Sequence, residues 1–437
     1  MIAIMKIEKL IKTRKARVAV IGLGYVGLPL AMEIARAGFH VSGIDIDEKK
    51  VSGIKKGISP VLDVPDKELR AAMDKGLFEA TTDFSVLAKA DAVSICVPTP
   101  LRKTRDPDIS YIVAAVEKIK NFIKQQQLIV LESTTYPGTT RELIMPTLEM
   151  GGLKAGKDFY LAFSPERIDP GNKHFMTKNT PKVVGGISDA CTKIAALFYS
   201  QFIENVVPVK TADAAEMVKL LENTFRSVNI GLVNEMAIIC NKLNIDVWEV
   251  IDAAATKPFG FMPFYPGPGL GGHCIPIDPH YLSWKLKELN YNARFIELAG
   301  EVNTHMPEFV LDKIVDVLNK KKKSLKGAKV FVLGISYKKD IDDMRESPAL
   351  DIIGLLLGKE AIVSYTDPYV PAIKLKDIKL NSSRLTPDTL KKADCVVLVT
   401  DHSSFDYEMI ATHSKVIIDT RNALKKINSH RGKIIKL

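Results

Sequence analysis

The stretch RVAVIGLGYVG, residues Arg17–Gly27, establishes the fold class of the N-terminal part of the chain. Its first five residues form a short apolar run, which is typical of a buried strand. Glycines follow at the spacing G-x-G-x-x-G, and Leu28–Ala37 has helical composition until Gly38 ends it. A second strand-like run, His40–Ile44, ends at Asp45. Strand, glycine turn, helix, strand and terminal acid together predict a dinucleotide-binding βαβ unit.

The same residues predict which dinucleotide binds. The glycines let a pyrophosphate lie against the helix N-terminus, and Asp45 can accept hydrogen bonds from a ribose diol while repelling a 2′-phosphate. NAD is therefore favoured over NADP, although Lys49 and Lys50 would attract a 2′-phosphate and weaken this discrimination. The predicted cofactor-binding residues, one of them from a later strand-end loop, are Gly22, Gly24, Tyr25, Val26, Gly27, Asp45, Lys50 and Thr99.

Strand-like and helix-like stretches continue to alternate, which predicts a doubly wound parallel sheet. The stretches are strands at Asp91–Val97, Leu128–Glu132 and Phe159–Phe163, and a helix over Ser110–Lys124. Loops rich in Pro, Ser and Thr follow the three strands at residues 98–100, 133–138 and 164–167. Each alone is typical of an ordinary turn. Ligands bind beyond the carboxyl ends of such strands, so three loops in succession favour a site.

Apolar residues at helical spacing predict one long helix from Asp213 to about Leu243. A helix of this length spans ~45 Å, more than one small domain needs, so we expect it to join two domains and to pack against another subunit. Lys219 and Asn223 lie four residues apart on one face. They are either site residues or part of an exposed polar face.

A second α/β domain is predicted after the Lys-rich stretch Lys320–Gly327. Shorter helices are expected before it at 247–255, 281–289, 293–304 and 309–320, and strands within it at 328–334, 361–365, 395–399 and 416–419. Its first turn, Gly334–Lys338, lacks the glycine triplet, so no second dinucleotide is expected there. The predicted architecture is two Rossmann-like doubly wound α/β domains, 1–210 and 321–437, joined by a central helical region, 211–320.

One cysteine, Cys274, lies in the glycine- and proline-rich stretch Gly267–Pro279. Glycines before the thiol let backbone and substrate approach it, and prolines fix the path of the loop. His273 and Asp278 are close in sequence and could activate the thiol as a nucleophile. The alternative is a buried cysteine in an ordinary Gly/Pro turn.

Composition narrows the class of protein. The chain has 437 residues, 46% of them hydrophobic, and a net charge of +10. Its Lys and Arg residues are dispersed, so neither a nucleic acid nor a membrane partner is expected. Five widely spaced cysteines without CxxC exclude a disulfide framework and a zinc ribbon, and no metal is expected. Without a signal-peptide pattern or a membrane-length apolar run, we expect a cytoplasmic protein.

Taken together, these motifs resemble the UDP-glucose/GDP-mannose dehydrogenase family over nearly the whole chain. The motifs are VIGLGYVGLP (Val20–Pro29), ESTTYPG (Glu132–Gly138), EMVKLLEN (Glu216–Asn223) and GGHC (Gly271–Cys274). Within the family, SPERxxPGN (Ser164–Asn172) and PGPGLGGHCIPIDP (Pro266–Pro279) most resemble UDP-N-acetylglucosamine 6-dehydrogenases.

The resemblance implies a four-electron oxidation of a sugar CH2OH group to a carboxylate, with two NAD per turnover. It implies that Cys274 carries a thiohemiacetal and then a thioester, and that Lys219 and Asn223 stabilise the oxyanion. It also implies that Asp278 works with Lys219 and a water, that Glu166 is the general base of hydrolysis and that Thr135 is a site threonine. The substrate-binding residues that it implies, in addition to Lys219 and Asn223, are Arg167, Lys338 and Arg421.

Two departures from the family pattern concern the substrate. Some members donate an arginine from a neighbouring subunit where this chain has Pro258, so Lys257 is the candidate substitute. Glucose-type members carry a second glutamate where this chain has Pro170, which favours a 2-acetamido sugar. We therefore predict UDP-N-acetylglucosamine as substrate, with UDP-N-acetylmannosamine or UDP-glucose as alternatives, and a homodimer or higher homo-oligomer.

Two other classes remain open from sequence. A hydroxyacid or 6-phosphogluconate-type dehydrogenase would share the NAD fold and the long helix but would not need Cys274 or a second α/β domain. A non-catalytic nucleotide-sugar-binding protein would keep the fold and lose the reactive residues. A UDP-sugar 6-dehydrogenase would form two NADH per sugar, a two-electron dehydrogenase one, and a non-catalytic binding protein none.

Overall fold

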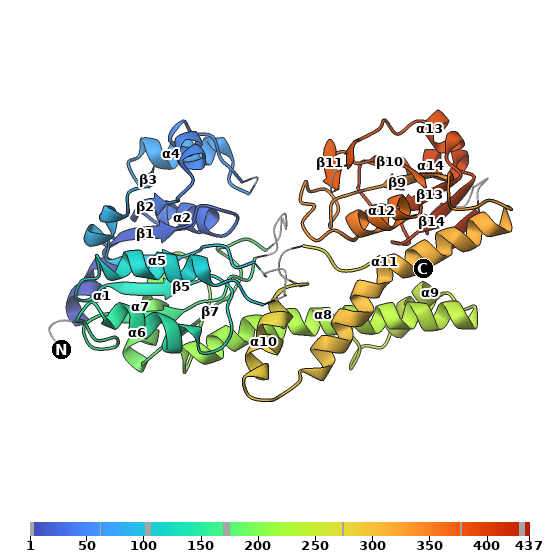
Figure 1. Ribbon diagram of the computed structural model, residues 1–437. Coiled ribbons are helices and arrows are strands. Elements are labelled where there is room, and N and C mark those ends of the chain that lie inside the picture. The colour runs from blue at the N-terminus through green and yellow to red at the C-terminus, as the bar shows by residue number, and fades with distance from the viewer. Residues whose placement is uncertain are drawn as a thin grey trace. The chain divides into compact units, whose positions relative to one another are not determined.

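The computed structural model describes residues 4–61, 63–100, 106–168, 175–272, 275–375, 378–427 and 433–437 (Figure 1). The chain forms two compact units, of which the first comprises Met1–Glu222 and His280–Tyr291 and the second Asn223–Pro279 and Asn292–Leu437. Helix α8, Ala212–Leu243, begins in the first unit and ends in the second. It matches the predicted long helix to within one residue.

The first unit is built on an eight-stranded sheet with the order β3-β2-β1-β4-β5-β6-β7-β8. The strands are β1 Arg17–Ile21, β2 His40–Ile44, β3 Phe78–Thr81, β4 Ala92–Ile95, β5 Leu128–Leu131, β6 Tyr160–Phe163, β7 Lys182–Gly186 and β8 Val206–Val209. The first six pair in parallel in the order typical of dinucleotide-binding sheets.

One edge of the sheet holds two strands, β7 and β8, that were not predicted from sequence, and there the sheet is not wholly parallel. Strand β7 pairs antiparallel with β6, and β8 runs parallel to β7. A parallel connection needs a crossover, usually a helix, and no helix lies between β6 and β7 in the described residues 164–168 and 175–181. The chain therefore returns in the opposite direction.

Both faces of this sheet are covered, as alternation along β1 shows. Val18 and Val20 belong to one apolar core, whereas Ala19 and Ile21 belong to another on the opposite face. The helices of this unit are α1 Ile4–Lys12, α2 Gly27–Arg36, α3 Glu48–Lys55, α4 Asp66–Asp74, α5 Ser110–Lys120, α6 Met145–Glu149, α7 Asp189–Tyr199 and α10 Asp278–Lys287, the last of which begins in the second unit. Burial on both faces confirms the doubly wound arrangement.

The second unit contains a five-stranded parallel sheet with the order β10-β9-β13-β14-β15 and a hairpin of β11 and β12. The strands are β9 Lys329–Leu333, β10 Ile362–Thr366, β11 Ala372–Leu375, β12 Ile378–Asn381, β13 Cys395–Leu398, β14 Val416–Asp419 and β15 Lys433–Lys436. The helices around them are α12 Pro348–Gly358, α13 Pro387–Lys392 and α14 Tyr407–His413. Val330 and Phe331 face opposite cores, so this sheet is also covered on both sides.

Helices α9 (Val247–Ala254) and α11 (Arg294–Lys320) complete the second unit. Two helices were expected where α11 forms one, because Pro307 lies inside it. A proline removes one helix hydrogen bond and usually interrupts a helix. Here Met306 and Val310, on either side of the proline, are both fully buried, so packing holds the helix together. The path of α11 is bent in Figure 1.

Candidate functional site

The glycine turn after β1 is closely packed at two of its three glycines. A Cβ on Gly22, whose φ is +94°, would lie 2.4 Å from the carbonyl oxygen of Cys96, and one on Gly27 would lie 1.8 Å from that of Gly22. Both distances are shorter than any real contact, so only glycine fits. These residues bring the start of α2 against the ends of β1 and β4.

The middle glycine is different. A Cβ on Gly24 would meet no atom of the described residues within 4 Å. Gly24 therefore borders open space immediately before α2, whose N-cap is Val26. A helix N-terminus facing such space suits the pyrophosphate of a dinucleotide, so the turn fits NAD. Tyr25 is 42% exposed in the same turn.

Asp45 is buried at the end of β2 and supports the turn. Its Oδ2 accepts a hydrogen bond from the Leu23 N–H at 2.8 Å and pairs with Lys50 Nζ at 2.7 Å. Its Oδ1 accepts from the Asp47 N–H at 3.0 Å. Lys50 is thus engaged by the carboxylate that would repel a 2′-phosphate, while Lys49 is exposed. This pairing weakens the argument that Lys50 favours NADP.

Thr99 is buried in the loop after β4. Its backbone carbonyl accepts a hydrogen bond from the Tyr281 hydroxyl at 2.9 Å. Tyr281 belongs to α10 and is fully buried. The position of Tyr281 at this loop was not predicted from sequence, because Tyr281 and Thr99 are 182 residues apart in the chain.

The loop after β5 carries Thr135 and is held by hydrogen bonds within the loop and to α8. Thr139 donates its proton to the Tyr136 carbonyl at 2.7 Å, so the 2.6 Å contact between the Thr135 and Thr139 hydroxyls has Thr135 as donor. Glu216 of α8 accepts from the N–H groups of Gly138 and Thr140 at 2.6 and 2.9 Å. Burial raises the pKa of Glu216 to about 7, against these hydrogen bonds.

Glu166 lies at the centre of a buried charge cluster in the first unit. Lys182 Nζ is 2.6 Å from Glu132 Oε2 and 3.2 Å from Glu166 Oε2, and Tyr199 donates to Glu132 Oε1 at 2.6 Å. Burial raises the pKa of Glu132, whereas for Glu166 burial is outweighed by Lys182 and nearby donors and the pKa is lowered. Glu166 is therefore a carboxylate at neutral pH.

Lys219 and Arg167 contact the same segment. The Lys219 ammonium donates to the backbone carbonyl of Glu166 at 2.7 Å. The Arg167 guanidinium makes a two-pronged pair with Glu222, at 2.6 and 3.1 Å, and donates to the Pro181 carbonyl. The structure thus brings the helix lysine to the loop of the proposed base. It places Arg167 in an ion pair within the protein.

In the second unit the predicted residues Asn223 and Asp278 are paired. The Asn223 amide donates to Asp278 Oδ2 at 2.5 Å, and both side chains are buried. The predicted nucleophile Cys274 and its neighbour His273 lie outside the described residues, as does Pro170.

The glycines before Cys274 allow two close approaches. A Cβ on Gly271 would lie 2.4 Å from the Cβ of Tyr337, and one on Gly267 would lie 2.6 Å from a guanidinium nitrogen of Arg421. The Gly272 N–H donates to the Arg345 carbonyl at 3.0 Å. The glycine stretch is therefore packed against the segments that carry the predicted substrate-binding residues Lys338 and Arg421.

The other four cysteines are unsuited to nucleophilic work. Cys96, Cys191, Cys240 and Cys395 are all buried and unpaired with one another. Burial raises the pKa of the Cys96 thiol well above its ordinary value and that of Cys395 to about 12. A buried thiol is neither ionised nor accessible.

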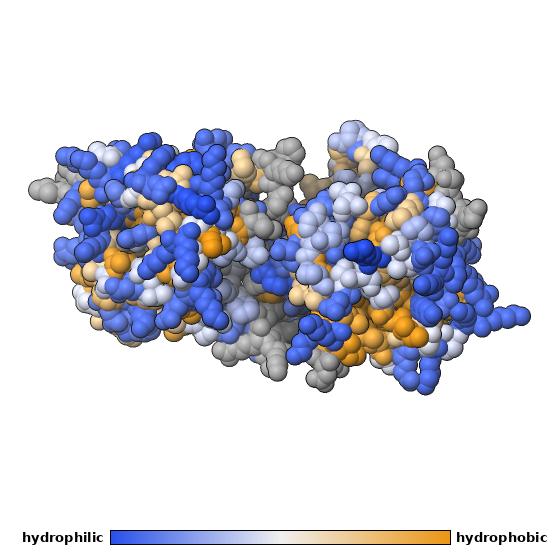
Figure 2. All heavy atoms as spheres, turned by 90° about the horizontal axis from the view of Figure 1, so that it is seen from above, coloured by the Kyte–Doolittle hydropathy of each residue, from blue (hydrophilic) through white to orange (hydrophobic). Residues whose placement is uncertain are grey.

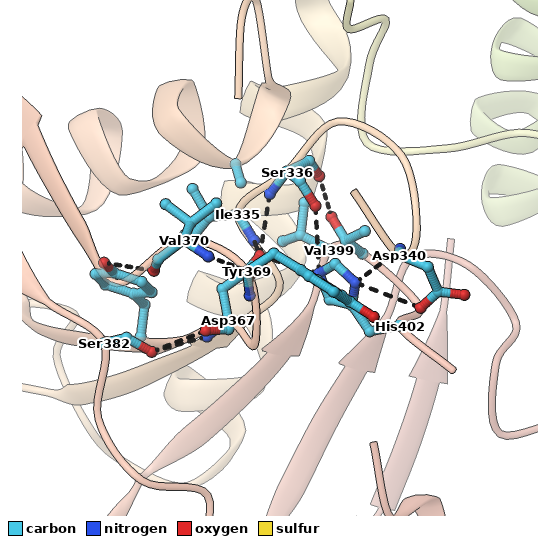
Figure 3. A network of polar contacts seen from close by, with 12 residues as sticks. Ile335, Ser336, Asp340, Asp367, Tyr369, Val370, Ser382, Val399 and His402 are labelled. Carbon is cyan, nitrogen blue, oxygen red and sulfur yellow. Dashed lines mark hydrogen bonds and ion pairs between the residues drawn. The ribbon is translucent and has the colours of Figure 1, made fainter. Parts of the chain in front are cut away.

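The buried His402 holds the loop between Ser336 and Asp340 in place (Figure 3), and Lys338 belongs to this loop. The Asp340 N–H donates to His402 Nδ1 at 3.0 Å, so the proton of the neutral ring is on Nε2, which donates to Asp367 Oδ2 at 3.0 Å. Ser336 donates to the Lys338 carbonyl at 3.0 Å.

Asp367 ends β10 as Asp45 ends β2, but it is more fully engaged. Besides His402 it accepts hydrogen bonds from the N–H groups of Ile335, Ser336, Tyr369 and Val370. A carboxylate offers about four acceptor positions. No capacity remains for a ribose diol, which supports the expectation that no second dinucleotide binds here.

A cavity of about 440 Å³ lies beside Arg421 within the second unit. Trp248 and Tyr265 line it and stack with ring centres 5.7 Å apart. Burial lowers the pKa of Arg421, an effect opposed by Asp401 and Asp419, and the group stays charged. Two lining residues have buried polar atoms without a hydrogen-bond partner in the described part of the chain, Nε1 of Trp248 and Oδ1 of Asn422.

Within the described ranges, no cluster of His, Cys, Asp and Glu is suitable for a metal, and no helix is long and apolar enough to cross a bilayer. The face seen in Figure 2 is mostly hydrophilic, with hydrophobic patches among the charged side chains.

Three family models match successive parts of the chain. They describe the NAD binding domain, the central domain and the UDP binding domain of one family, over residues 16–203, 213–305 and 331–426. The chain belongs to the UDP-glucose/GDP-mannose dehydrogenase family. As a member, it is an NAD-dependent oxidoreductase with a UDP-binding domain.

Relatives within this dehydrogenase family carry two substrate names. The UDP-N-acetyl-D-mannosamine dehydrogenase of Methanococcus maripaludis strain C7 is 35% identical, over 94% of this chain and 93% of its own length. The UDP-N-acetyl-D-glucosamine 6-dehydrogenase of Pseudomonas aeruginosa is 34% identical, over 89% of this chain and 91% of its own. The structure of a UDP-D-ManNAc dehydrogenase from Pyrococcus horikoshii has a TM-score of 0.87 at 34% identity, covering 96% of this chain and 99% of that one.

Several residues of these dehydrogenase-family sites were missed from sequence. Lys182 begins β7, whose antiparallel pairing could not be foreseen, Glu132 directly follows β5, and His402 lies in a short loop with no motif. Glu132 was within a quoted motif, so its position at a strand end was the one available indication.

Proposed function

We propose that this protein oxidises carbon 6 of a UDP-2-acetamido sugar to a carboxylate in two NAD-dependent steps, with UDP-N-acetylglucosamine as the expected substrate. The observation that carries the proposal is the contact between the Lys219 ammonium and the Glu166 segment, 2.7 Å long. This hydrogen bond connects Lys219, the proposed oxyanion stabiliser, to the segment of Glu166, the proposed base. Glu166 follows the carboxyl end of β6, in the sheet that also carries the glycine turn for NAD.

NAD, held by the glycine turn and Asp45, would supply the hydride acceptor for both oxidations. The first oxidation gives an aldehyde, which the Cys274 thiolate attacks to form a thiohemiacetal. The second oxidation converts it to a thioester. The Lys219 ammonium and the Asn223 amide stabilise the negative charge that develops on the sugar oxygen. Asp278 orients Asn223 through the 2.5 Å hydrogen bond.

Hydrolysis of the thioester needs a base. The Glu166 carboxylate is ionised, and its Oε1 is already occupied by the N–H groups of Arg167 and Ile168, at 2.7 and 2.8 Å. One acceptor position on Oε2 remains beside the 3.2 Å contact with Lys182. We assign that position to the hydrolytic water.

The UDP part of the substrate is assigned to the second unit. The Arg421 guanidinium lines the 440 Å³ cavity, and the Lys338 loop is fixed by His402. Cations in a preformed pocket suit a diphosphate. The stacked Trp248 and Tyr265 rings line the same cavity and provide an aromatic wall.

A second candidate substrate, UDP-N-acetylmannosamine, is favoured by the names of relatives. The relatives at 35–37% identity carry that name, whereas the glucosamine-named ones are 33–34% identical. The Pro170 pattern favours an acetamido sugar without separating the two epimers, so the gluco assignment rests on the lead-in Pro266–Leu270.

A substrate panel tests the proposal. NADH formation is followed with UDP-N-acetylglucosamine, UDP-N-acetylmannosamine and UDP-glucose, and kcat/KM is compared. We expect both acetamido sugars to exceed UDP-glucose by about tenfold or more, because an unmatched acetamido pocket costs about 1–3 kcal/mol. A kcat/KM for UDP-glucose equal to the larger of the other two would contradict the acetamido assignment. Preference for the manno epimer would select the second candidate.

A further inference from the structure

Lys182 owes its position to the reversal of β7. Because β7 runs antiparallel to β6, its first residue lies at the edge where β5 and β6 end. The observed pairs are Ala162 with Gly186 and Phe163 with Gly185, and the same register continued places Lys182 opposite Glu166. Parallel strands would have put this lysine at the far edge of the sheet.

The surroundings of Lys182 are those of a buried ion cluster. The lysine side chain is 5% exposed, that of Glu132 is fully buried and that of Glu166 is 12% exposed. Burying an ammonium is costly unless it is paired. Burial alone would lower the pKa of Lys182. Glu132 and Glu166 raise it by more, so the pKa lies above its ordinary value. One cation therefore serves two carboxylates.

We propose that Lys182 is a positioning residue for thioester hydrolysis, which fixes Glu166 as an ionised carboxylate with one acceptor position directed to water. This inference rests on the proposed function. Two backbone N–H groups restrain Oε1 of Glu166, and Lys182 restrains Oε2. Glu132, held by the Tyr199 hydroxyl, fixes Lys182 in turn.

Hydrolysis of the thioester transfers one proton, forms one bond to the acyl carbon and breaks another. The water oxygen bonds to the acyl carbon, its proton passes to Glu166, and the C–S bond breaks with its electron pair on the Cys274 sulfur. The products are the sugar acid and a thiolate. No oxidant is needed, and Lys182 keeps its proton throughout.

Loss of Lys182 should change the titration of Glu166. The charged and titratable groups around Glu166 are Lys182, Glu132, Cys96, Lys219 and Arg167, with Tyr199 behind Glu132. Without the lysine, burial and the Glu132 charge both favour the protonated acid, opposed by Lys219 and the two N–H groups. A protonated Glu166 cannot accept the proton of water. Hydrolysis then requires higher pH.

The test compares Lys182→Met with Lys182→Arg, which keeps a cation. In rapid mixing at pH 6.5, Lys182→Met should form two NADH per subunit at a rate near wild type and then turn over about a hundredfold more slowly. Its steady-state rate should recover as pH rises, whereas Lys182→Arg should keep the wild-type pH profile. Without Lys182, Glu132 would be a buried carboxylate without its ion-pair partner. The double variant Lys182→Met/Glu132→Gln removes that charge, and it is compared with wild type if Lys182→Met does not fold.

Two results would overturn the inference. One is an unchanged pH profile in Lys182→Met together with equal slowing of both oxidations and hydrolysis, which indicates a structural role only. The other is loss of the two-NADH burst in both methionine variants while Lys182→Arg is fully active. Failure of the proposed function is recognised separately, because wild type would then form no NADH from any UDP-sugar.

Discussion

At the scale of single residues, the expected cofactor preference and the proposed hydrolysis depend on two carboxylates with defined partners. Asp45 contacts the glycine turn and Lys50, and Glu166 contacts Lys182 and the Lys219 ammonium. In both places a carboxylate is held by a lysine, which fixes its orientation. Each contact leads to a test by substitution.

Cys274→Ser should abolish complete turnover, because a serine hydroxyl is far less ionised than a thiol and cannot form the thioester. We expect at most one NADH per sugar from the variant. Cys240→Ala is the matched control, since Cys240 is buried in α8 and unpaired, and it should keep two. Full activity of Cys274→Ser would end the thioester mechanism. The NADH formed per sugar by each variant is measured by absorbance with limiting substrate.

Asp45 should set the choice of cofactor. Wild type should prefer NAD to NADP by a wide margin in kcat/KM, and Asp45→Ser should reduce that ratio at least about tenfold, or about 1.4 kcal/mol, by removing the repulsive charge. Lys55→Ala, at an exposed lysine at the far end of α3, is the control and should leave the ratio intact. Equal use of both cofactors by wild type would show that the lysines dominate.

Glu216 should make stability depend on pH. Its folded pKa, about 7, lies above the ordinary 4.5, so the folded protein keeps a proton that the unfolded chain has lost. The free energy of unfolding therefore falls as pH rises from about 4.5 to about 7, by roughly 3 kcal/mol from this group.

The measurement is the difference in melting temperature between wild type and Glu216→Gln at pH 5 and pH 7.5. Glutamine does not titrate, so this difference should vary with pH. Glu235→Gln, at an exposed position of the same helix, should give a constant difference. A constant difference for Glu216→Gln as well would show that this carboxyl titrates normally.

At the scale of elements, α8 is the helix most accurately predicted from sequence, because its apolar spacing persists over its whole length. Its exposed apolar residues also form a stripe at intervals of four and seven. They are Met217 at 38%, Leu221 at 59%, Phe225 at 45%, Leu232 at 55%, Ile239 at 39% and Leu243 at 62% exposure. Such a stripe is typical of a helix that packs against another subunit.

We expect a homodimer built on this stripe. Leu232→Glu should introduce a charge into the interface and give a monomer by light scattering at micromolar concentration. Met150→Glu, at a 75% exposed residue of the other unit, should leave the dimer intact. A monomeric wild type would refute the expectation.

Other elements show where sequence patterns fall short. The glycine turn, β1, β2 and four strands of the second sheet, β9, β10, β13 and β14, were predicted from short apolar runs, whereas its fifth strand, β15, was not. The reversal of β7 and the continuity of α11 through Pro307 were not predicted either, because both depend on what the rest of the fold packs against them. The reversal matters most, since it brings Lys182 to the site.

At the scale of the whole molecule, the chain combines an NAD-binding sheet and a UDP-binding domain, linked in sequence by α8 and α11. The sequence pattern predicted that Asp45, Thr135 and Glu166 follow the ends of strands, and the structure has them after β2, β5 and β6. The pattern could not locate Glu132 with Lys182, or Asp367 with His402, because those pairs join segments that only the folded chain brings together.

The number of NADH formed per sugar tests the central claim most directly. A limiting, weighed amount of UDP-N-acetylglucosamine, and separately of its manno epimer, is oxidised to completion with excess NAD, and NADH is measured by absorbance. The four-electron mechanism predicts two NADH per sugar consumed for the true substrate and a product with a carboxylate at carbon 6. One NADH per sugar, with an aldehyde as the final product, would contradict it.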